Sequence, residues 1–263
     1  MPKDTGGATV KILEQGNIYF MYRPKVAKKA GAEDIEAEDS GDVGRFYMVL
    51  KPDGRTLYRL FVLGRKRMPN VREHERSWGF VAMVSDDPKE LEQELQGHTY
   101  STKTRGQRQQ PTTRPAGEGS YAIAAIGNRR QAHLIYVLEL PRDRGEVQKE
   151  LGIKTEASFA LSIKNPEKGQ RTAGGLKEAQ QADYPKPLQE RFRNRRFDTE
   201  HPELLDYEGA EIILVGARTD PEEAYGLDLE PEQEDQGTAD IIKDLRMVQS
   251  RHPIEPLFRG EWR

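Results

Sequence analysis

The sequence predicts an α+β protein built from antiparallel β-sheets with short peripheral helices. First, segments of strand length that are rich in β-branched and aromatic residues dominate the first two thirds of the chain. Second, residues typical of tight turns separate several of these segments. Third, short amphipathic segments follow Asp-Pro or Asn-Pro pairs, which are typical of helix starts. The 263 residues, of which 35% are hydrophobic, are enough for one core or two small ones.

The N-terminal part is expected to contain four strands, over residues 17–26, 45–52, 56–67 and 78–85. Pro52, Asp53 and Gly54 supply a tight turn between the second and third strands, because glycine adopts positive φ without strain. After the fourth strand, Asp87 can cap a short helix that has Pro88 at its first position.

The rest of the chain is expected to alternate strands and helices. In order, we expect a hairpin over 121–128 and 131–141, a helix over 145–153, a strand over 157–167, a helix over 187–197, a strand over 210–218 and a helix over 238–249. The tail 253–263 carries Leu257, Phe258 and Trp262. Such residues are rare in disordered tails, so we expect an extended tail docked on the core or on a neighbouring subunit.

The order strand, turn, strand, connection, strand and Asp/Asn-Pro occurs twice. An internal duplication would give two related ββαβ-like modules, whereas the alternative is a set of hairpins that merely share turn chemistry. The corresponding organisation is an N-terminal β-rich module (1–97), a basic loop or linker (98–116), a second ββαβ-like module (117–185) and a C-terminal helix–strand–helix extension (186–263) that packs back on the core.

Composition excludes several classes of protein. The 41 Lys and Arg against 44 Asp and Glu give a net charge of −3, which argues against coating nucleic acid by bulk charge but permits local basic patches. The absence of cysteine excludes disulfides, thiolate metal sites and a Cys nucleophile. No apolar run is long enough to span a membrane and the start of the chain does not resemble a secretory signal, so we expect a cytoplasmic protein.

The most unusual local feature is the segment 98–116, which has no acid in 19 residues. Its basic residues are Lys103, Arg105, Arg108 and Arg114. They could contact phosphates, and Tyr100 could stack on a base. The same composition also fits an arm for a protein partner or an inert linker.

Two further basic clusters are present. Arg65 and Arg67 alternate at the end of an expected strand, so they should share one face of the sheet. The second cluster contains Lys186, Arg191, Arg193, Arg195 and Arg196, interleaved with Phe192 and Phe197. On a helix its basic face could bind phosphate, but pairing with the acidic stretch 219–235, within the chain or between subunits, is the favoured interpretation.

The sequence contains no complete catalytic, metal or nucleotide-binding motif. The His–carboxylate neighbours at 74–75 and 201–203 lack the spacing of metal ligands, and His133 in an apolar strand is more typical of a structural histidine than of a general base. We therefore expect no metal and no cofactor, and the balance favours a non-catalytic protein.

Three functional hypotheses follow. The leading one is a binding protein that contacts an anionic partner, foremost RNA or DNA, through basic loops. The second is a scaffold or assembly subunit that pairs acidic and basic segments with a protein partner or with another copy. The third is an enzyme acting on a phosphorylated small substrate. One continuous basic face would favour the binding protein, whereas basic clusters that are each paired with acidic segments would favour the assembly subunit. A pocket with converging Arg, His and carboxylate side chains would favour the enzyme.

Overall fold

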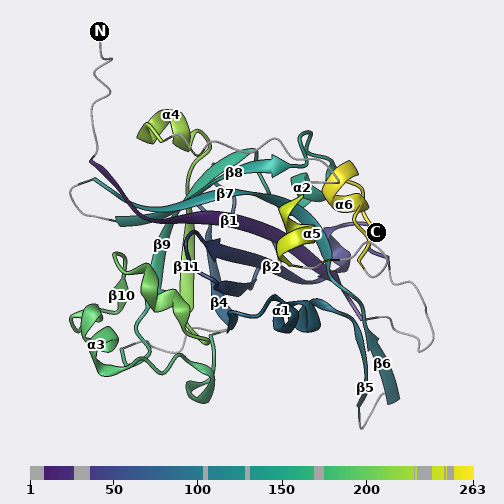
Figure 1. Ribbon diagram of the computed structural model, residues 1–263, viewed down its shortest axis with the longest axis horizontal. Helices are drawn as coiled ribbons and strands as arrows, with labels where there is room; N and C mark the ends of the chain where they lie inside the picture. Colours follow the sequence, from purple (N-terminus) through teal and green to yellow (C-terminus); the bar gives the residue numbers. More distant parts are fainter. Residues whose placement is uncertain are drawn as a thin grey trace.

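Eight antiparallel strands close into a barrel in the computed structural model, which describes residues 9–26, 36–102, 106–127, 131–168, 175–227, 229, 239–245, 247 and 252–263 (Figure 1). The barrel strands are β1 (Val10–Pro24), β2 (Val43–Pro52), β3 (Tyr58–Leu63), β4 (Arg76–Ser85), β7 (Arg114–Ile126), β8 (Gln131–Leu140), β9 (Glu156–Lys164) and β11 (Glu211–Arg218). Their order around the barrel is β9-β11-β4-β3-β2-β1-β7-β8, and β8 pairs back with β9 to close it. The short strand β10 (Phe197–Asp198) lies beside the end of β9.

The closed barrel corrects the expected α+β fold. Most expected strands exist at or near the expected positions, but pairings between distant segments join them into one cylinder. Ile18 of β1 pairs with Gly119 of β7, and Tyr136 of β8 pairs with Ala157 of β9. Both expected modules thus contribute strands to the same barrel. Closure removes the open edges that separate sheets would have.

Alternating side chains along each strand build two cores. On β1, Ile18, Phe20 and Tyr22 belong to the core inside the barrel. Tyr19 and Met21 belong to a second core on the outer face. Because such strands are buried on both faces, they read as nearly continuous apolar runs.

Short helices cover parts of the barrel. α1 (Pro88–Leu95), α5 (Asp240–Asp244) and α6 (Glu255–Arg259) contribute to the outer core. α2 (Glu146–Glu150) connects β8 to β9, and α4 (Pro221–Tyr225) follows β11. The predicted cap of α1 is confirmed, since the Asp87 carboxylate accepts a 2.9 Å hydrogen bond from the Lys89 backbone N–H. None of the described helices has the length and apolar character needed to cross a membrane.

The C-terminal tail is docked, as predicted. Leu257 is fully buried, and the Trp262 ring packs edge-on against Tyr22 with 5.1 Å between ring centroids. The Gln148 amide donates a 2.8 Å hydrogen bond to the Pro256 carbonyl. The expected extended conformation is wrong over part of the tail, because residues 255–259 form α6.

Three other segments differ from the expectation. The segment 98–110 contains a two-stranded hairpin, β5 (His98–Thr102) and β6 (Gly106–Gln110). The helix expected over 187–197 is replaced by α3 (Lys186–Gln189) and the 3₁₀ turn η3 (Glu190–Phe192). The helix expected over 238–249 is observed over 240–244. Further 3₁₀ turns are η1 (Ser40–Asp42), η2 (Glu178–Gln180) and η4 (Pro202–Asp206).

Candidate functional site

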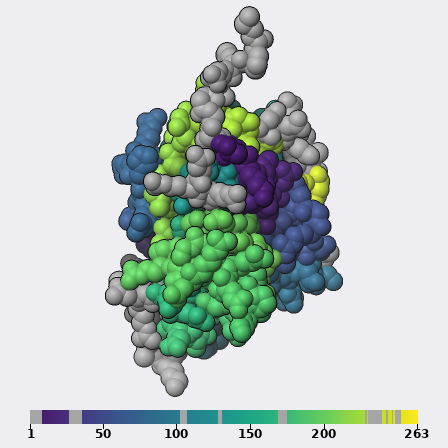
Figure 2. All heavy atoms as spheres, turned by 90° about the vertical axis from the view of Figure 1, so that its left-hand side faces the viewer, coloured from purple at the N-terminus to yellow at the C-terminus, as the bar shows by residue number. Residues whose placement is uncertain are grey.

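The barrel has two ends with different coverings. At the α2 end, the β3–β4 loop meets the β8–β9 connection, and the Met68 N–H donates to the Leu151 carbonyl at 2.8 Å. At the α3 end, β9 finishes beside β10, and α3, η3 and η4 follow. Figure 2 shows that the green residues of this part of the chain form the broad lower surface of that side of the molecule.

The α3 end of the barrel holds a buried network of charges. Arg59, which points inward from β3, donates to both oxygens of Glu14 at 2.6 and 2.8 Å. Its Nε donates to Asp206 of η4 at 2.7 Å, and the Tyr121 hydroxyl donates to Glu14 at 2.8 Å. Burial, together with the charge of Glu14, raises the pKa of Tyr121 far above its usual range, so the phenol stays protonated.

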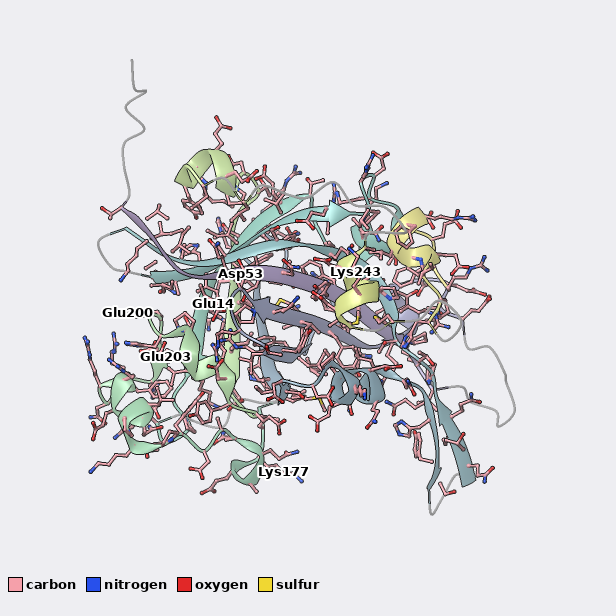
Figure 3. All side chains as sticks on the ribbon, viewed as in Figure 1. Glu14, Asp53, Lys177, Glu200, Glu203 and Lys243 are labelled. Atoms are coloured by element: carbon pink, nitrogen blue, oxygen red, sulfur yellow. The ribbon has the colours of Figure 1, made fainter. Side chains whose placement is uncertain are left out.

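This network is a structural clamp. A cavity of about 330 Å³ lies beside it, lined by Leu13, Glu14, Gln15, Pro52, Asp53, Arg55, Pro202 and Glu203. Figure 3 shows Glu14, Asp53 and Glu203 at the same end of the barrel. All three side-chain nitrogens of Arg59 donate to Glu14 or Asp206, and the side chain is completely buried, so this arginine is already paired with two carboxylates. The clamp thus joins η4 to the barrel. It does not support the hypothesis of an enzyme that binds the phosphate of its substrate at this position.

The residues expected to contact an anion do not form one face. Arg65 and Arg67 lie in the β3–β4 loop at the α2 end rather than on a strand, and each contacts Glu75 at 2.8 Å. Burial would raise the pKa of Glu75, but hydrogen bonds from the Asn70 N–H and from Arg67, with the two arginine charges, lower it. The two arginines therefore share one carboxylate within their own loop, which compensates only part of their charge.

The basic segment 98–116 is divided between the hairpin and the barrel. Tyr100 and Arg108 face each other across β5 and β6, while Arg114 is buried at the start of β7. Lys103 and Arg105 lie outside the described residues. In Figure 1 this hairpin projects at the lower right, whereas α3 lies at the lower left. A single basic surface that joins these segments is therefore not observed.

The third cluster is exposed at the α3 end. We call it the α3–β10 patch and define it by Lys186, Arg191, Arg193, Arg195, Arg196 and Phe197, all of which are exposed. Arg195 lies 3.7 Å from Asp198 and 3.9 Å from Glu200. Among the residues that the structure describes, the other four basic side chains of the patch have no acidic group within 4.0 Å. Phe197 is 36% exposed and is one of two large apolar side chains at the surface among the described residues.

Local packing explains why the patch is not a helix. Phe192 is fully buried against Tyr184, with 5.6 Å between ring centroids. Arg193 and Asn194 then adopt φ of 48° and 63°, a left-handed conformation that ends the helical turns. The buried Asn165 donates a 2.9 Å hydrogen bond to the Arg195 carbonyl and thereby holds the segment against the end of β9.

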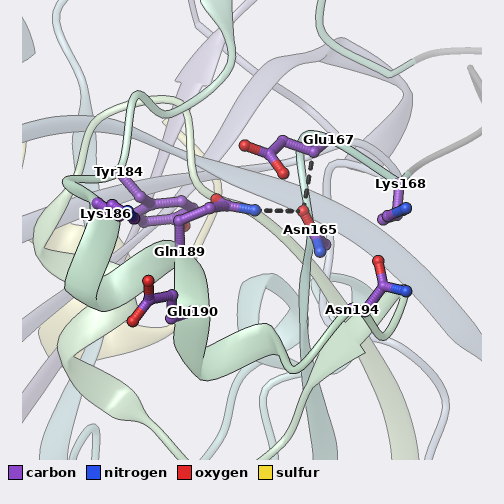
Figure 4. A pocket seen from close by; sticks show the side chains of 8 residues that line it. All are labelled: Asn165, Glu167, Lys168, Tyr184, Lys186, Gln189, Glu190 and Asn194. Carbon is purple, nitrogen blue, oxygen red and sulfur yellow. Dashed lines mark hydrogen bonds between the residues drawn. The ribbon is translucent and has the colours of Figure 1, made fainter.

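A pocket adjoins the patch. We call it the amide pocket; its volume is about 430 Å³, and its lining residues are Asn165, Glu167, Lys168, Tyr184, Lys186, Gln189, Glu190 and Asn194 (Figure 4). Sequence reasoning missed this pocket because its residues come from two segments joined only by folding. It also missed the Arg59 network, although an arginine at an inward position between Tyr58 and Leu60 was a detectable signal.

The favoured pairing of this cluster with the acidic stretch 219–235 is not observed in the part of the chain that the structure describes. Instead, α4 packs near β8, where Tyr225 contacts His133 with 5.8 Å between ring centroids. Burial lowers the pKa of His133 from 6.5 to about 4, so the imidazole is neutral at neutral pH. Within the described ranges, no group of three or more His, Asp or Glu side chains is placed to hold a metal ion.

We compared the chain with protein-family models, with curated proteins and with solved structures, and none of the three comparisons produced a match.

Proposed function

We propose that the protein binds single-stranded RNA or DNA through the α3–β10 patch. The observation that carries this proposal is the local charge of the patch: Lys186, Arg191, Arg193 and Arg196 are exposed and, among the described residues, have no acid within 4.0 Å. Arginine and lysine at the surface contact phosphates, and this electrostatic term supplies most of the affinity for nucleic acid without sequence preference.

The exposed aromatic ring favours a single strand. Phe197 directly follows Arg195 and Arg196 in the sequence, and the side chains of all three residues are exposed. Unpaired bases stack on aromatic side chains while basic groups follow the backbone, and each stacked base contributes about 1–3 kcal/mol. Bases within a duplex are not available for this contact.

The test is fluorescence anisotropy with a labelled single strand, titrated between about 50 and 200 mM salt. The wild-type Kd should lie between about 1 and 100 µM near physiological salt and should be much lower at the lowest salt. Phe197→Ser should weaken binding roughly fivefold or more through the loss of stacking. Absence of binding into the tens of micromolar at low salt would refute the proposal.

A charge-removal variant locates the binding site. The variant combines Arg191→Ser, Arg193→Asn and Arg196→Ser, with asparagine at 193 because it tolerates left-handed backbone. Loss of these cations should reduce the slope of log K against log salt by about 2, since each phosphate contact on a single strand contributes about 0.7. The control combines Arg72→Ser, Arg76→Ser and Lys89→Ser, which removes the same charge elsewhere and should leave most of the affinity.

The assembly hypothesis predicts a different result from the same variants. If the wild-type protein forms an oligomer that the patch variant dissociates, the patch pairs with protein rather than with nucleic acid. The cytoplasmic location expected from the sequence remains part of our proposal.

A further inference from the structure

We infer that the amide pocket holds one unstacked base of the bound strand and favours adenine and cytosine, in which an exocyclic amino group lies next to an unprotonated ring nitrogen on the Watson–Crick edge. This inference rests on the proposed function, because it assigns a role to the pocket that adjoins the α3–β10 patch. The pocket volume of about 430 Å³ lies within the range of small-molecule sites, roughly 300–1,000 Å³.

The floor of the pocket is organised by a buried amide. Asn165 is 1% exposed, and its oxygen accepts hydrogen bonds from the Gln189 amide at 2.8 Å and from the Glu167 N–H at 3.0 Å. Its nitrogen donates to the Arg195 carbonyl, which belongs to the patch. Figure 4 shows the Gln189–Asn165 and Glu167–Asn165 contacts crossing the pocket. Asn165 therefore fixes both the pocket floor and the neighbouring patch backbone.

The contact with Asn165 leaves the Gln189 side chain in a defined orientation. Its Nε2 donates to Asn165, and among the described residues no donor contacts its Oε1. An amide oxygen held in this way can accept a hydrogen bond from a base amino group, and the second N–H of Gln189 can donate to a ring nitrogen. This combination of acceptor and donor matches one edge of adenine or cytosine.

The other lining groups agree with this ligand. The carboxylates of Glu167 and Glu190, both exposed, can accept from exocyclic amino groups but would repel a phosphate placed between them. Lys186 and Lys168 lie toward opposite sides of the pocket in Figure 4, where they can contact the phosphates on either side of an inserted base. Uracil and thymine lack an amino group and should bind less tightly.

The backbone joins the pocket to the patch. Arg193 belongs to the patch and Asn194 lines the pocket, and both adopt positive φ. This conformation is disfavoured for arginine, so the surrounding structure must hold Arg193 in place, whereas asparagine tolerates it at position 194. Arg193, the cation proposed to bind phosphate, is therefore the direct chain neighbour of Asn194, which lines the base pocket.

The experiment compares short homopolymers of A, C and U by anisotropy at low salt, with titrations of AMP, CMP and UMP followed by NMR. The wild-type protein should bind the A and C strands roughly fivefold or more tightly than the U strand. Gln189→Leu should abolish the preference while leaving the salt dependence unchanged. Asn194→Gly, which keeps the left-handed backbone, should reduce the preference.

The possible results separate the two proposals. Equal binding of A, C and U, or a preference that survives Gln189→Leu in a folded variant, overturns the pocket assignment and leaves the proposed function intact. Binding of AMP and CMP over UMP without binding of any strand overturns the proposed function and supports the pocket. Failure of both strands and mononucleotides to bind overturns both. The patch variant serves as the matched control, since it should weaken all homopolymers equally and keep their order.

Discussion

Arg59 of β3 and Glu14 of β1 form a two-pronged ion pair inside the barrel, with nitrogen–oxygen distances of 2.6 and 2.8 Å. The two strands are not neighbours in the sheet, because β2 lies between them. The pair therefore crosses the barrel interior, and Asp206 adds a second carboxylate from η4. Arg59 is completely buried, so its charge depends on these partners.

Removal of this cation should destabilise the fold strongly. Arg59→Met leaves Glu14 and Asp206 without their shared partner, and we expect the free energy of unfolding to fall by about 3–5 kcal/mol in chemical denaturation. Arg23→Met is the matched control, since Arg23 is 2% exposed and, within the described ranges, has no acid within 4.0 Å. That substitution should change stability far less. Equal losses in the two variants would contradict a stabilising role for the ion pair.

The docked tail should contribute measurably to stability. Leu257 is fully buried in the outer core, so Leu257→Ala should cost about 2–5 kcal/mol in urea denaturation. Arg259→Ala, in the same helix α6 but exposed, should stay within about 0.5 kcal/mol of the wild type. If Leu257→Ala unfolds at the wild-type midpoint, the tail does not dock in solution.

His133 should make stability depend on pH. Its pKa is about 4 in the folded protein because of burial, whereas an unfolded histidine titrates near 6.5. The stabilising contribution is complete above about pH 6.5 and is lost as the pH falls toward 4, because only the unfolded chain takes up the proton in that interval. His133→Phe should therefore show a smaller decrease in Tm between about pH 7.5 and 4.5 than the wild type does. His98→Phe, at an exposed position, should follow the wild type, and identical decreases in all three proteins would refute the assignment.

Gly119 should tolerate no side chain. A Cβ at this position would lie 2.0 Å from the Val137 carbonyl oxygen, at a register shift in the β7–β8 pairing. We expect Gly119→Ala to lower the free energy of unfolding by at least about 2 kcal/mol. Gly54→Ala is a control with positive φ but open space, for which backbone strain alone costs about 1–2 kcal/mol. Calorimetry compares the two, and a smaller loss at Gly119 would show that the strands separate easily there.

The sequence was informative about local structure and much less so about the candidate site. The cap at Asp87 and the turn at Gly54 were predictable because they depend on residues a few positions apart. The basic composition of the α3–β10 patch was visible as well. The helix predicted over 187–197 was wrong, because the burial of Phe192 and the contacts of Asn165 end the helical turns early. Neither contact can be read from the helical periodicity of the sequence.

By itself, the sequence determined where the chain is extended, where it turns and where positive charge accumulates, since these properties follow from composition and from near neighbours. Only the tertiary structure decided that the strands close into one barrel, because closure depends on pairings such as β8 with β9 and β4 with β11. It also decided which charges are available. Arg59 is paired with Glu14 and Asp206, which lie 45 and 147 positions away in the sequence. In contrast, the side chains of Arg191, Arg193 and Arg196 lie at the surface. A charge run in a sequence does not reveal this difference, because the energy of an ionised group is determined by its burial and its partners in space.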